Sequence, residues 1–207
     1  LRLYLRRVEA LYEVLLQERI VQLREEAPFF RWASGRLSPV YLDFRRCLAY
    51  PNLRQALVEA LRLRLSEGGL TFQSVAGVAT GGISWAAWLA DKLNLPMGYV
   101  RSAPKAHGTS RTVEGLLPNH SPVLLIEDVL STGQSVAIAA AHVVEEGFHL
   151  AGIAALWDYV LPHRNPLPYP TLSVLKFPQA LEAWQPHIPS TQYTLLLQWH
   201  KTGELPT

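Results

Sequence analysis

Two adjacent carboxylates, Glu127 and Asp128, stand between an apolar run and a short turn of small and hydroxyl side chains. The run, residues 123–126, is short and branched, which is typical of a buried parallel strand. The turn, residues 131–135, precedes an alanine-rich helix predicted over 136–146. In open α/β sheets ligands bind at the carboxyl ends of strands, and the N–H groups that begin a helix favour an anion. The pattern therefore predicts carboxylates that bind sugar hydroxyls beside a turn that binds phosphate, which suits a phosphorylated ribose.

A second turn of small residues, Thr80, Gly81 and Gly82, joins a predicted strand to a predicted helix. Glycine allows the backbone to approach an anion closely, although a plain strand-to-helix turn has the same composition. If both turns lie at the same edge of the sheet, they would hold two phosphate groups of one ligand.

Three cations, Arg101, Lys105 and His107, lie at the head of a polar stretch, residues 102–122, that shows no periodicity. Loops of this length in a compact domain usually have a function or are disordered. These cations are expected to close over a polyanion and to neutralise the charge on a departing diphosphate. The alternative is a solvated loop whose charges are incidental.

Strands and helices alternate through the middle of the chain, which predicts an α/β fold with a mostly parallel sheet covered on both faces. The predicted strands are residues 74–78, 97–101, 123–126 and 150–157, and the predicted helices are residues 51–65, 83–93 and 136–146. Outside this region the predictions are one or two helices over 3–23, a hairpin or short strands over 29–44, and a helix near 178–184.

Composition limits the class of protein. The 207 residues suit one α/β domain, and a net charge of +2 gives no argument for a nucleic-acid partner or an anionic membrane. No apolar stretch approaches the ~20 residues that span a bilayer. The single cysteine, Cys47, allows no internal disulfide, and the seven histidines show no spacing typical of a zinc site. We expect a cytoplasmic protein with no nucleic-acid partner and no membrane partner.

Three segments resemble one family. Residues 127–135 resemble the ribose-5-phosphate motif of the type I phosphoribosyltransferases. Residues 99–108, together with Glu114 and Gly115, are similar to the hood loop of the orotate phosphoribosyltransferases, a branch of that family. Residues 30–35 are similar to the same branch, as are the positions that follow them: Ser38, Pro39, Tyr41, Asp43 and Arg45. The resemblance covers most of the chain, and the three motifs together are highly specific.

The resemblance implies the type I phosphoribosyltransferase fold, with a central, mostly parallel sheet flanked by helices and a long flexible catalytic loop. It implies a single domain over residues 1–207. Within that domain, N-terminal helices and hood strands are expected over about 1–48, the core over about 49–160 and a C-terminal completion over about 161–207.

The resemblance also implies a reaction. Orotate and 5-phosphoribosyl 1-diphosphate (PRPP) would give orotidine 5′-monophosphate and diphosphate, a step of pyrimidine (UMP) biosynthesis. Mg²⁺ would be held mainly by PRPP, with no direct protein ligand implied. The family forms homodimers in which the loop reaches the neighbouring subunit's site.

Site residues follow from the resemblance position by position. Catalytic roles are implied for Lys105, His107 and Asp128. The residues implied to bind PRPP are Thr80, Gly81, Gly82, Arg101, Lys105, His107, Glu127, Asp128, Val129, Leu130, Ser131, Thr132, Gly133, Gln134 and Ser135. The residues implied to bind orotate are Ser34, Tyr41, Ser131 and Tyr159.

Some positions depart from the family's pattern. Gln134 stands where a second small residue is common, so its side chain either crowds the phosphate or swings outward. Ala103 replaces a frequent lysine, and Ser84 replaces a frequent proline. Ala33 and Tyr159 stand where some branches place a lysine and an arginine that hold the orotate carboxylate.

Two alternatives remain open. One is a regulator that binds PRPP without catalysis, and the other is a transferase for a different base. Lys105 and His107 favour an enzyme over a regulator, and residues 30–45 favour orotate over other bases.

Overall fold

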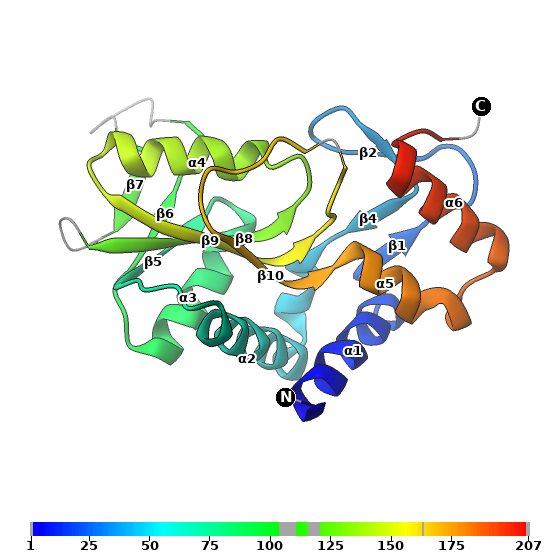
Figure 1. The fold of residues 1–207 in the computed structure, drawn as a ribbon, viewed down its shortest axis with the longest axis horizontal. Coiled ribbons are helices and arrows are strands. Elements are labelled where there is room, and N and C mark those ends of the chain that lie inside the picture. The colour runs from blue at the N-terminus through cyan, green and yellow to red at the C-terminus, as the bar shows by residue number, and fades with distance from the viewer. Residues whose placement is uncertain (1, 104–110, 116–120, 163, 206–207) are drawn as a thin grey trace.

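The computed structural model describes residues 2–103, 111–115, 121–162 and 164–205. Its centre is a six-stranded sheet in the order β10-β9-β8-β5-β6-β7 (Figure 1). The strands are β5 (Ser74–Val78), β6 (Met97–Val100), β7 (Val113–Gly115), β8 (Pro122–Leu130), β9 (His149–Asp158) and β10 (Thr171–Lys176). Neighbours are parallel except β6 and β7, which are antiparallel. The prediction of a mostly parallel α/β sheet is confirmed.

Helices cover both faces of this sheet. The helices are α1 (Arg2–Gln17), α2 (Pro51–Gly68), α3 (Gly81–Leu93), α4 (Gln134–Glu145), α5 (Phe177–Trp184) and α6 (Ser190–Thr202). Figure 1 shows α4 on one face and α2 and α3 on the other. A hydrophobic core lies on each face of the sheet, and the side chains of β8 point alternately into one and the other. Val123 and Leu125 pack with α4, whereas Leu124 and Ile126 pack with α2 and α3. A strand buried on both faces is therefore continuously apolar.

The N-terminal part forms a small layered unit beside the sheet, which we call the hood (residues 21–49). Its strands are β1 (Val21–Leu23), β2 (Phe30–Arg31), β3 (Leu37–Ser38) and β4 (Val40–Leu42), and a 3₁₀ helix, η1 (Phe44–Ala49), follows them. β1 pairs with β4, and β2 pairs with β3, both antiparallel. The prediction of short strands over 29–44 is confirmed.

The prediction that helical structure continues to Leu23 is wrong. The helix ends at Gln17, and Arg19 takes a left-handed conformation (φ 54°) that turns the chain. Val21–Leu23 then pairs with β4, and this long-range pairing outweighs the helical spacing of the leucines.

Other element predictions also need correction. β8 does not end before the acids but continues to Leu130, because β9 pairs with it as far as Asp158. α4 begins at Gln134, two residues earlier than predicted. The polar stretch 102–122 contains a strand, β7, that pairs with β6, and the helix α6 was not predicted.

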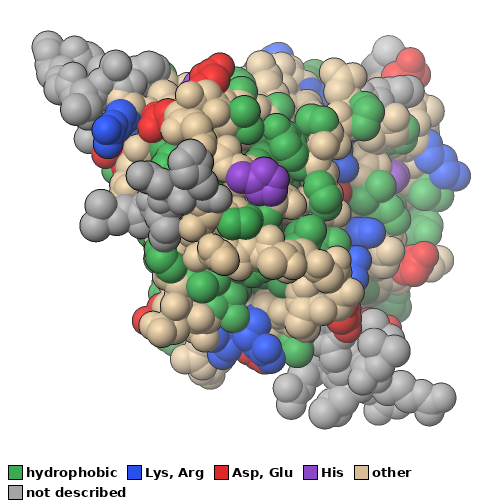
Figure 2. All heavy atoms as spheres, turned by 60° about the vertical axis from the view of Figure 1, so that its left-hand side comes forward, with side chains coloured by type: hydrophobic (Ala, Val, Ile, Leu, Met, Phe, Trp, Pro, Cys, Tyr) green, Lys and Arg blue, Asp and Glu red, His purple; other side chains and the backbone are tan. Residues whose placement is uncertain are grey.

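Helix length and the distribution of basic side chains are the features relevant to a membrane or nucleic-acid partner. None of the described helices is long and apolar enough to cross a lipid bilayer. Figure 2 shows the side of the molecule at the left of Figure 1, where Lys and Arg side chains occur in small separate groups. Among the described residues of that face, the Lys and Arg side chains do not form one continuous basic surface.

Candidate active site

A cavity of about 360 Å³ opens where β5 and β8 end. Its lining residues are Trp32, Ala33, Tyr41, Leu42, Asp43, Arg45, Thr80, Gly81, Asp128, Val129, Ser131 and Tyr159. They come from the hood, from the turn after β5, from the end of β8 and from the residue after β9. The cavity therefore brings together segments that are far apart in the sequence, at the sheet edge where α/β proteins bind ligands.

The two adjacent acids face different surroundings. Asp128 lines the cavity, whereas Glu127 is 4 % exposed and lies behind it. Glu127 Oε2 accepts a hydrogen bond from Ser135 Oγ (2.9 Å), and its Oε1 accepts one from the backbone N–H of Asp128 (3.1 Å). Burial, and then the negative charge of Asp128, raise the pKa of the Glu127 carboxyl well above its ordinary value.

The turn after β8 runs from the cavity wall directly into helix α4. Ser131 lines the cavity, and Gly133 takes a left-handed conformation (φ 81°) directly before the first residue of α4. A Cβ at Gly133 would lie 3.4 Å from Arg164 Cδ. Arg164 is itself held by Asp158, with Nη1–Oδ1 at 2.5 Å and Nη2–Oδ2 at 3.1 Å. The free N–H groups at the start of α4 therefore follow a turn against which the Arg164 side chain packs.

The turn after β5 packs directly against the acid pair. The Ala79–Thr80 peptide bond is cis, and Thr80 precedes the first residue of α3. A Cβ at Gly81 would overlap the Asp128 carboxylate, so only glycine allows this close approach. The start of α3 therefore lies against Asp128, whereas the start of α4 contacts Glu127 through Ser135.

The opposite end of the cavity is aromatic. The rings of Trp32 and Tyr159 have centroids 4.6 Å apart, and Tyr41 stacks on Phe30 at 5.6 Å. Tyr159 is 2 % exposed, and its burial raises the pKa of the phenol well above its ordinary value. This end offers flat apolar surfaces to a planar ring, with hydroxyl groups as the polar contacts.

One cation reaches the cavity wall among the residues that the structure describes. Arg45 Nε donates to Asp43 Oδ1 (2.6 Å), and Arg45 Nη2 donates to the Tyr41 hydroxyl (3.3 Å). The hydrogen bond from Arg45 to Asp43 raises the pKa of the guanidinium further, so it stays charged at any working pH.

The structure places the predicted site residues unevenly. Those that line the cavity are Tyr41, Thr80, Gly81, Asp128, Val129, Ser131 and Tyr159. Those that lie in or beside the same segments without lining it are Gly82, Glu127, Leu130, Thr132, Gly133, Gln134 and Ser135. Leu130 is 1 % exposed, so only its backbone is open to a ligand role. Gln134 is exposed, so its side chain extends outward into solvent.

Other predicted residues lie elsewhere. Ser34 is exposed and does not line the cavity, where Trp32 and Ala33 stand instead. Arg101 lies at the end of β6, with Nε donating to the Ala103 carbonyl (3.3 Å). Lys105 and His107 lie outside the described residues.

Sequence reasoning gave no role to several lining residues. Trp32, Asp43 and Arg45 line the cavity, although only their place in a resembling segment drew attention to them. Asp43 follows the last residue of β4, so no strand periodicity marked it as a lining residue.

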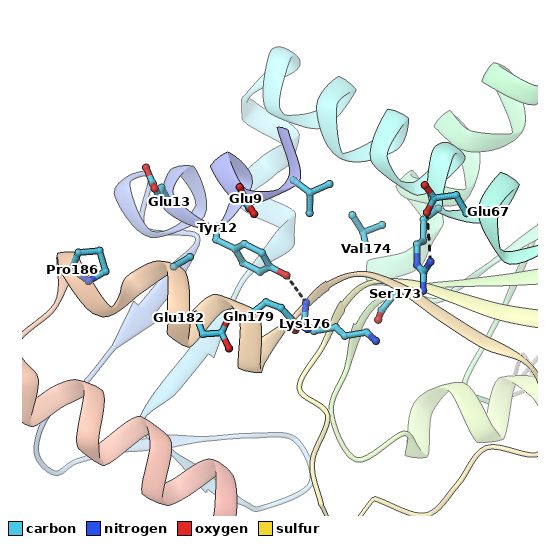
Figure 3. Close-up of a pocket in the computed structure, with 13 residues that line it drawn as sticks. Glu9, Tyr12, Glu13, Glu67, Ser173, Val174, Lys176, Gln179, Glu182 and Pro186 are labelled. Atoms are coloured by element: carbon cyan, nitrogen blue, oxygen red, sulfur yellow. Dashed lines mark hydrogen bonds and ion pairs between the residues drawn. The ribbon is translucent and has the colours of Figure 1, made fainter. Parts of the chain in front are cut away.

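A second cavity, of about 600 Å³, lies between α1, α2, β10 and α5 (Figure 3). Its wall contains Glu9, Glu13, Glu67 and Glu182, and Tyr12 Oη accepts a hydrogen bond from the Lys176 backbone N–H (2.9 Å). It holds none of the predicted site residues and no anion turn, so the smaller cavity is the candidate active site.

The family model described as phosphoribosyl transferase domain matches residues 49–171. This range contains both turns and the acid pair, and it covers more than half of the chain. The match defines the class of protein to which the site belongs.

Individual relatives narrow the class. The chain is 37 % identical over 195 residues to the orotate phosphoribosyltransferase of Lactobacillus johnsonii, covering 90 % of this chain and 91 % of the relative. It is 40 % identical over 193 residues to that of Cutibacterium acnes, covering 90 % and 89 %. The crystal structure of orotate phosphoribosyltransferase from Aeropyrum pernix matches with a TM-score of 0.71 at 30 % identity, covering 84 % of this chain and 99 % of that one. The chain therefore belongs to the orotate phosphoribosyltransferase family.

Proposed function

We propose that this protein transfers the phosphoribosyl group from PRPP to orotate, giving orotidine 5′-monophosphate and diphosphate. The observation that carries the proposal is a single cavity with anion turns and a carboxylate at one end and closely packed aromatic rings at the other. A sugar diphosphate suits the first end, and a planar pyrimidine suits the second. The match to orotate phosphoribosyltransferases over about nine-tenths of the chain supports the same assignment.

Each segment has a role in this reaction. The turn that contains Ser131 and Gly133 binds the 5′-phosphate, and the turn at Thr80 and Gly81 faces the diphosphate. The bond from C1 of the ribose to the diphosphate oxygen breaks, and a ring nitrogen of orotate forms the new bond to C1. Positive charge develops on the ribose between these events, and the Asp128 carboxylate stabilises it. Trp32 and Tyr159 hold the pyrimidine ring so that its nitrogen faces C1.

Magnesium fits the site as a partner of the substrate. Among the described residues, no group of three or more His, Cys, Asp or Glu side chains could hold a metal ion. Asp128 presents a partly exposed carboxylate to the cavity, and Mg²⁺ commonly takes one carboxylate together with substrate phosphates and water. When bound, the ion neutralises charge on the departing diphosphate.

The loop cations and the assembly complete the proposal. Lys105 and His107 contact the diphosphate from the neighbouring subunit of a homodimer. A mixture of the Lys105→Ala and Asp128→Asn variants tests this sharing. In a mixed dimer one site retains its own Asp128 and receives Lys105 from the partner, so dissociation and random reassociation restore about a quarter of the wild-type rate. No recovery on mixing contradicts a shared loop.

The deciding experiment follows orotate absorbance in the presence of PRPP and Mg²⁺, with uracil and hypoxanthine as control bases. We expect loss of orotate and no reaction of the controls. Tight PRPP binding without orotate loss indicates a regulator instead, and reaction of a control base indicates a transferase of other specificity.

A further inference from the structure

Few of the described residues that line the active-site cavity are charged. Asp43 and Asp128 carry carboxylates, Arg45 carries a guanidinium, and the other described lining residues are uncharged. A ligand that brings a carboxylate of its own is repelled by the two acids and attracted by the guanidinium. Arg45 is therefore the group in the described wall that an anionic base would contact.

The position of Arg45 is set by its neighbours. Phe44, directly before it, is 1 % exposed and packs edge-on against the Trp85 ring, with centroids 6.2 Å apart. The guanidinium makes two hydrogen bonds, one from Nε to Asp43 Oδ1 (2.6 Å) and one from Nη2 to the Tyr41 hydroxyl (3.3 Å). The buried neighbour and the two hydrogen bonds together hold the guanidinium in one orientation at the cavity wall.

The tip of the guanidinium is free to bind a ligand. Of its five N–H groups, Asp43 and Tyr41 take one each, and the other three have no acceptor among the described residues. The free groups include both on Nη1 and one on Nη2, and one from each nitrogen points outward in parallel. The Arg45 side chain is 63 % exposed, so this fork is accessible. Two parallel N–H groups match the two oxygens of a carboxylate.

Arg45 lies between the two ends of the cavity. Its partner Tyr41 stacks on Phe30 at the aromatic end. The hydrogen bond to Asp43 and the charge of Asp43 raise the pKa of the guanidinium most, and the charge of Asp128, beside the turns, also raises it. Orotate carries its carboxylate on C6, next to the ring nitrogen that bonds to C1 of the ribose. When that nitrogen faces C1, the carboxylate lies at the boundary between the two ends, where the guanidinium stands.

We propose that Arg45 binds the carboxylate of orotate through its free Nη1 and Nη2 groups, and that this contact distinguishes orotate from pyrimidines without a carboxylate. The inference rests on the proposed function, because it names a contact to the same substrate. Asp43 and Tyr41 hold the guanidinium in place. A base such as uracil forgoes the two charge-assisted hydrogen bonds and binds more weakly.

Steady-state kinetics of Arg45→Ala give the first test. The KM for orotate should rise about 10- to 100-fold, which is the range expected for hydrogen bonds between charged groups. The KM for PRPP should change by less than about twofold, because the two turns are untouched. A rise in the KM for PRPP as large as that for orotate would assign Arg45 to the diphosphate and overturn the proposal.

Nucleotide binding isolates the carboxylate. Orotidine 5′-monophosphate and uridine 5′-monophosphate share the phosphate, the ribose and the pyrimidine ring, and they differ in the carboxylate on C6. Isothermal titration calorimetry of each nucleotide gives the ratio of the two Kd values. The wild type should bind orotidine 5′-monophosphate at least about tenfold more tightly, and in Arg45→Ala the two Kd values should agree within about twofold. A ratio in Arg45→Ala equal to that of the wild type overturns the proposal.

A matched control and a conservative variant stand beside Arg45→Ala. Arg46 is the next residue, is exposed and does not line the cavity, so Arg46→Ala should keep the wild-type ratio. Arg45→Lys keeps the charge and loses the planar fork, so its ratio should lie between those of the wild type and Arg45→Ala. Equal ratios in Arg45→Lys and Arg45→Ala would show that charge at this position does not act on the carboxylate, and they overturn the proposal. A loss of the ratio in Arg46→Ala as large as that in Arg45→Ala does the same.

The nucleotide ratio also keeps this inference distinct from the proposed function. If the wild type does not consume orotate but prefers orotidine 5′-monophosphate through Arg45, the proposed function fails and the carboxylate contact stands. If the wild type consumes orotate and shows no preference between the two nucleotides, the proposed function stands and the role of Arg45 is overturned.

Discussion

The two ends of the cavity are built by different means. The anion end consists of backbone turns that follow long, paired strands, and β8 is paired with β9 up to its last residue, Leu130. The base end consists of side chains on or next to hood strands that are only two or three residues long, such as Tyr41 and Trp32, and of Tyr159 directly after β9. The anion end is therefore defined by main-chain conformation, whereas the base end is defined by the identity of its side chains.

The base end needs support from the C-terminal part of the chain. Trp199 Nε1 donates to the Leu37 carbonyl (3.1 Å), and His200 Nε2 is 2.8 Å from the Tyr159 carbonyl oxygen. The Trp199 ring also packs edge-on against Trp32 at 5.5 Å. Aromatic packing from α6 thus adds support to hood strands whose pairing extends over only two or three residues. The comparison predicts that substitutions at the anion end act through conformation and charge, and those at the base end through lost contact area.

The largest effect is expected at Asp128, the carboxylate that lines the cavity and packs against Gly81. Asp128→Asn keeps the shape of the carboxylate and removes its charge, so it should lower kcat about 100-fold, or roughly 2.7 kcal/mol. Steady-state kinetics with saturating PRPP and orotate measure this loss. Asp91→Asn, at an exposed position on α3, is the control and should be silent. A kcat for Asp128→Asn within about threefold of wild type would remove Asp128 from the mechanism.

Gly133→Ala tests the dependence of the anion end on backbone conformation. The left-handed conformation of Gly133 costs an alanine about 1–2 kcal/mol, and the new Cβ would also meet Arg164. We expect the KM for PRPP to rise about tenfold while the KM for orotate stays nearly constant. A rise in both constants would show that the two ends are not independent.

Trp32→Ala tests whether the base end depends on side-chain contact with orotate. Aromatic stacking on a base is worth about 1–3 kcal/mol, and part of this is retained by the Tyr159 ring, so the KM for orotate should rise about fivefold. Trp32→Phe keeps a ring and should recover most of the loss. The KM for PRPP is the internal control. A change in the KM for PRPP as large as that for orotate would contradict the division of the cavity into two ends.

The same division explains what sequence alone could predict. The acid pair and the phosphate turn lie together in the chain, so their chemistry is visible as a local pattern at residues 127–135. The base end is assembled from Trp32 and Tyr159, which meet only in the folded protein, and apart from its resemblance to a known segment no local spacing identifies it. Ser34 was predicted from its place in that segment alone, and it does not line the cavity.

Element boundaries failed where tertiary pairing outweighed local composition. Two acids in a row are typical of a strand end, yet pairing with β9 carries β8 past Glu127 and Asp128. Helical leucine spacing likewise gave way at Val21–Leu23, where pairing with β4 decides the structure. Both errors occur at residues whose partners lie far along the chain, which a window of neighbouring residues does not contain.

Glu127 gives the anion end a pH dependence of its own. Its burial and the charge of Asp128 raise its pKa in the folded protein, so the folded state binds the proton more tightly than the unfolded state does. The free energy of unfolding should therefore fall as the pH rises from the ordinary pKa of glutamate through the raised value. Urea unfolding at several pH values measures this slope, and Glu127→Gln, which cannot ionise, should flatten it. An unchanged slope in Glu127→Gln would assign the pH dependence to other groups.

The smallest effect is expected one residue away from Gly133. Gln134 departs from the family's pattern, but its side chain is exposed, and what the turn offers to the phosphate is the backbone N–H groups at the start of α4. Gln134→Ala should therefore change the KM for PRPP by less than about twofold, since alanine keeps the backbone and suits a helix at least as well. Measured beside Gly133→Ala, it compares two neighbouring positions in the same turn. A loss in Gln134→Ala as large as that in Gly133→Ala would show that a side chain, not the main chain, defines this end of the cavity.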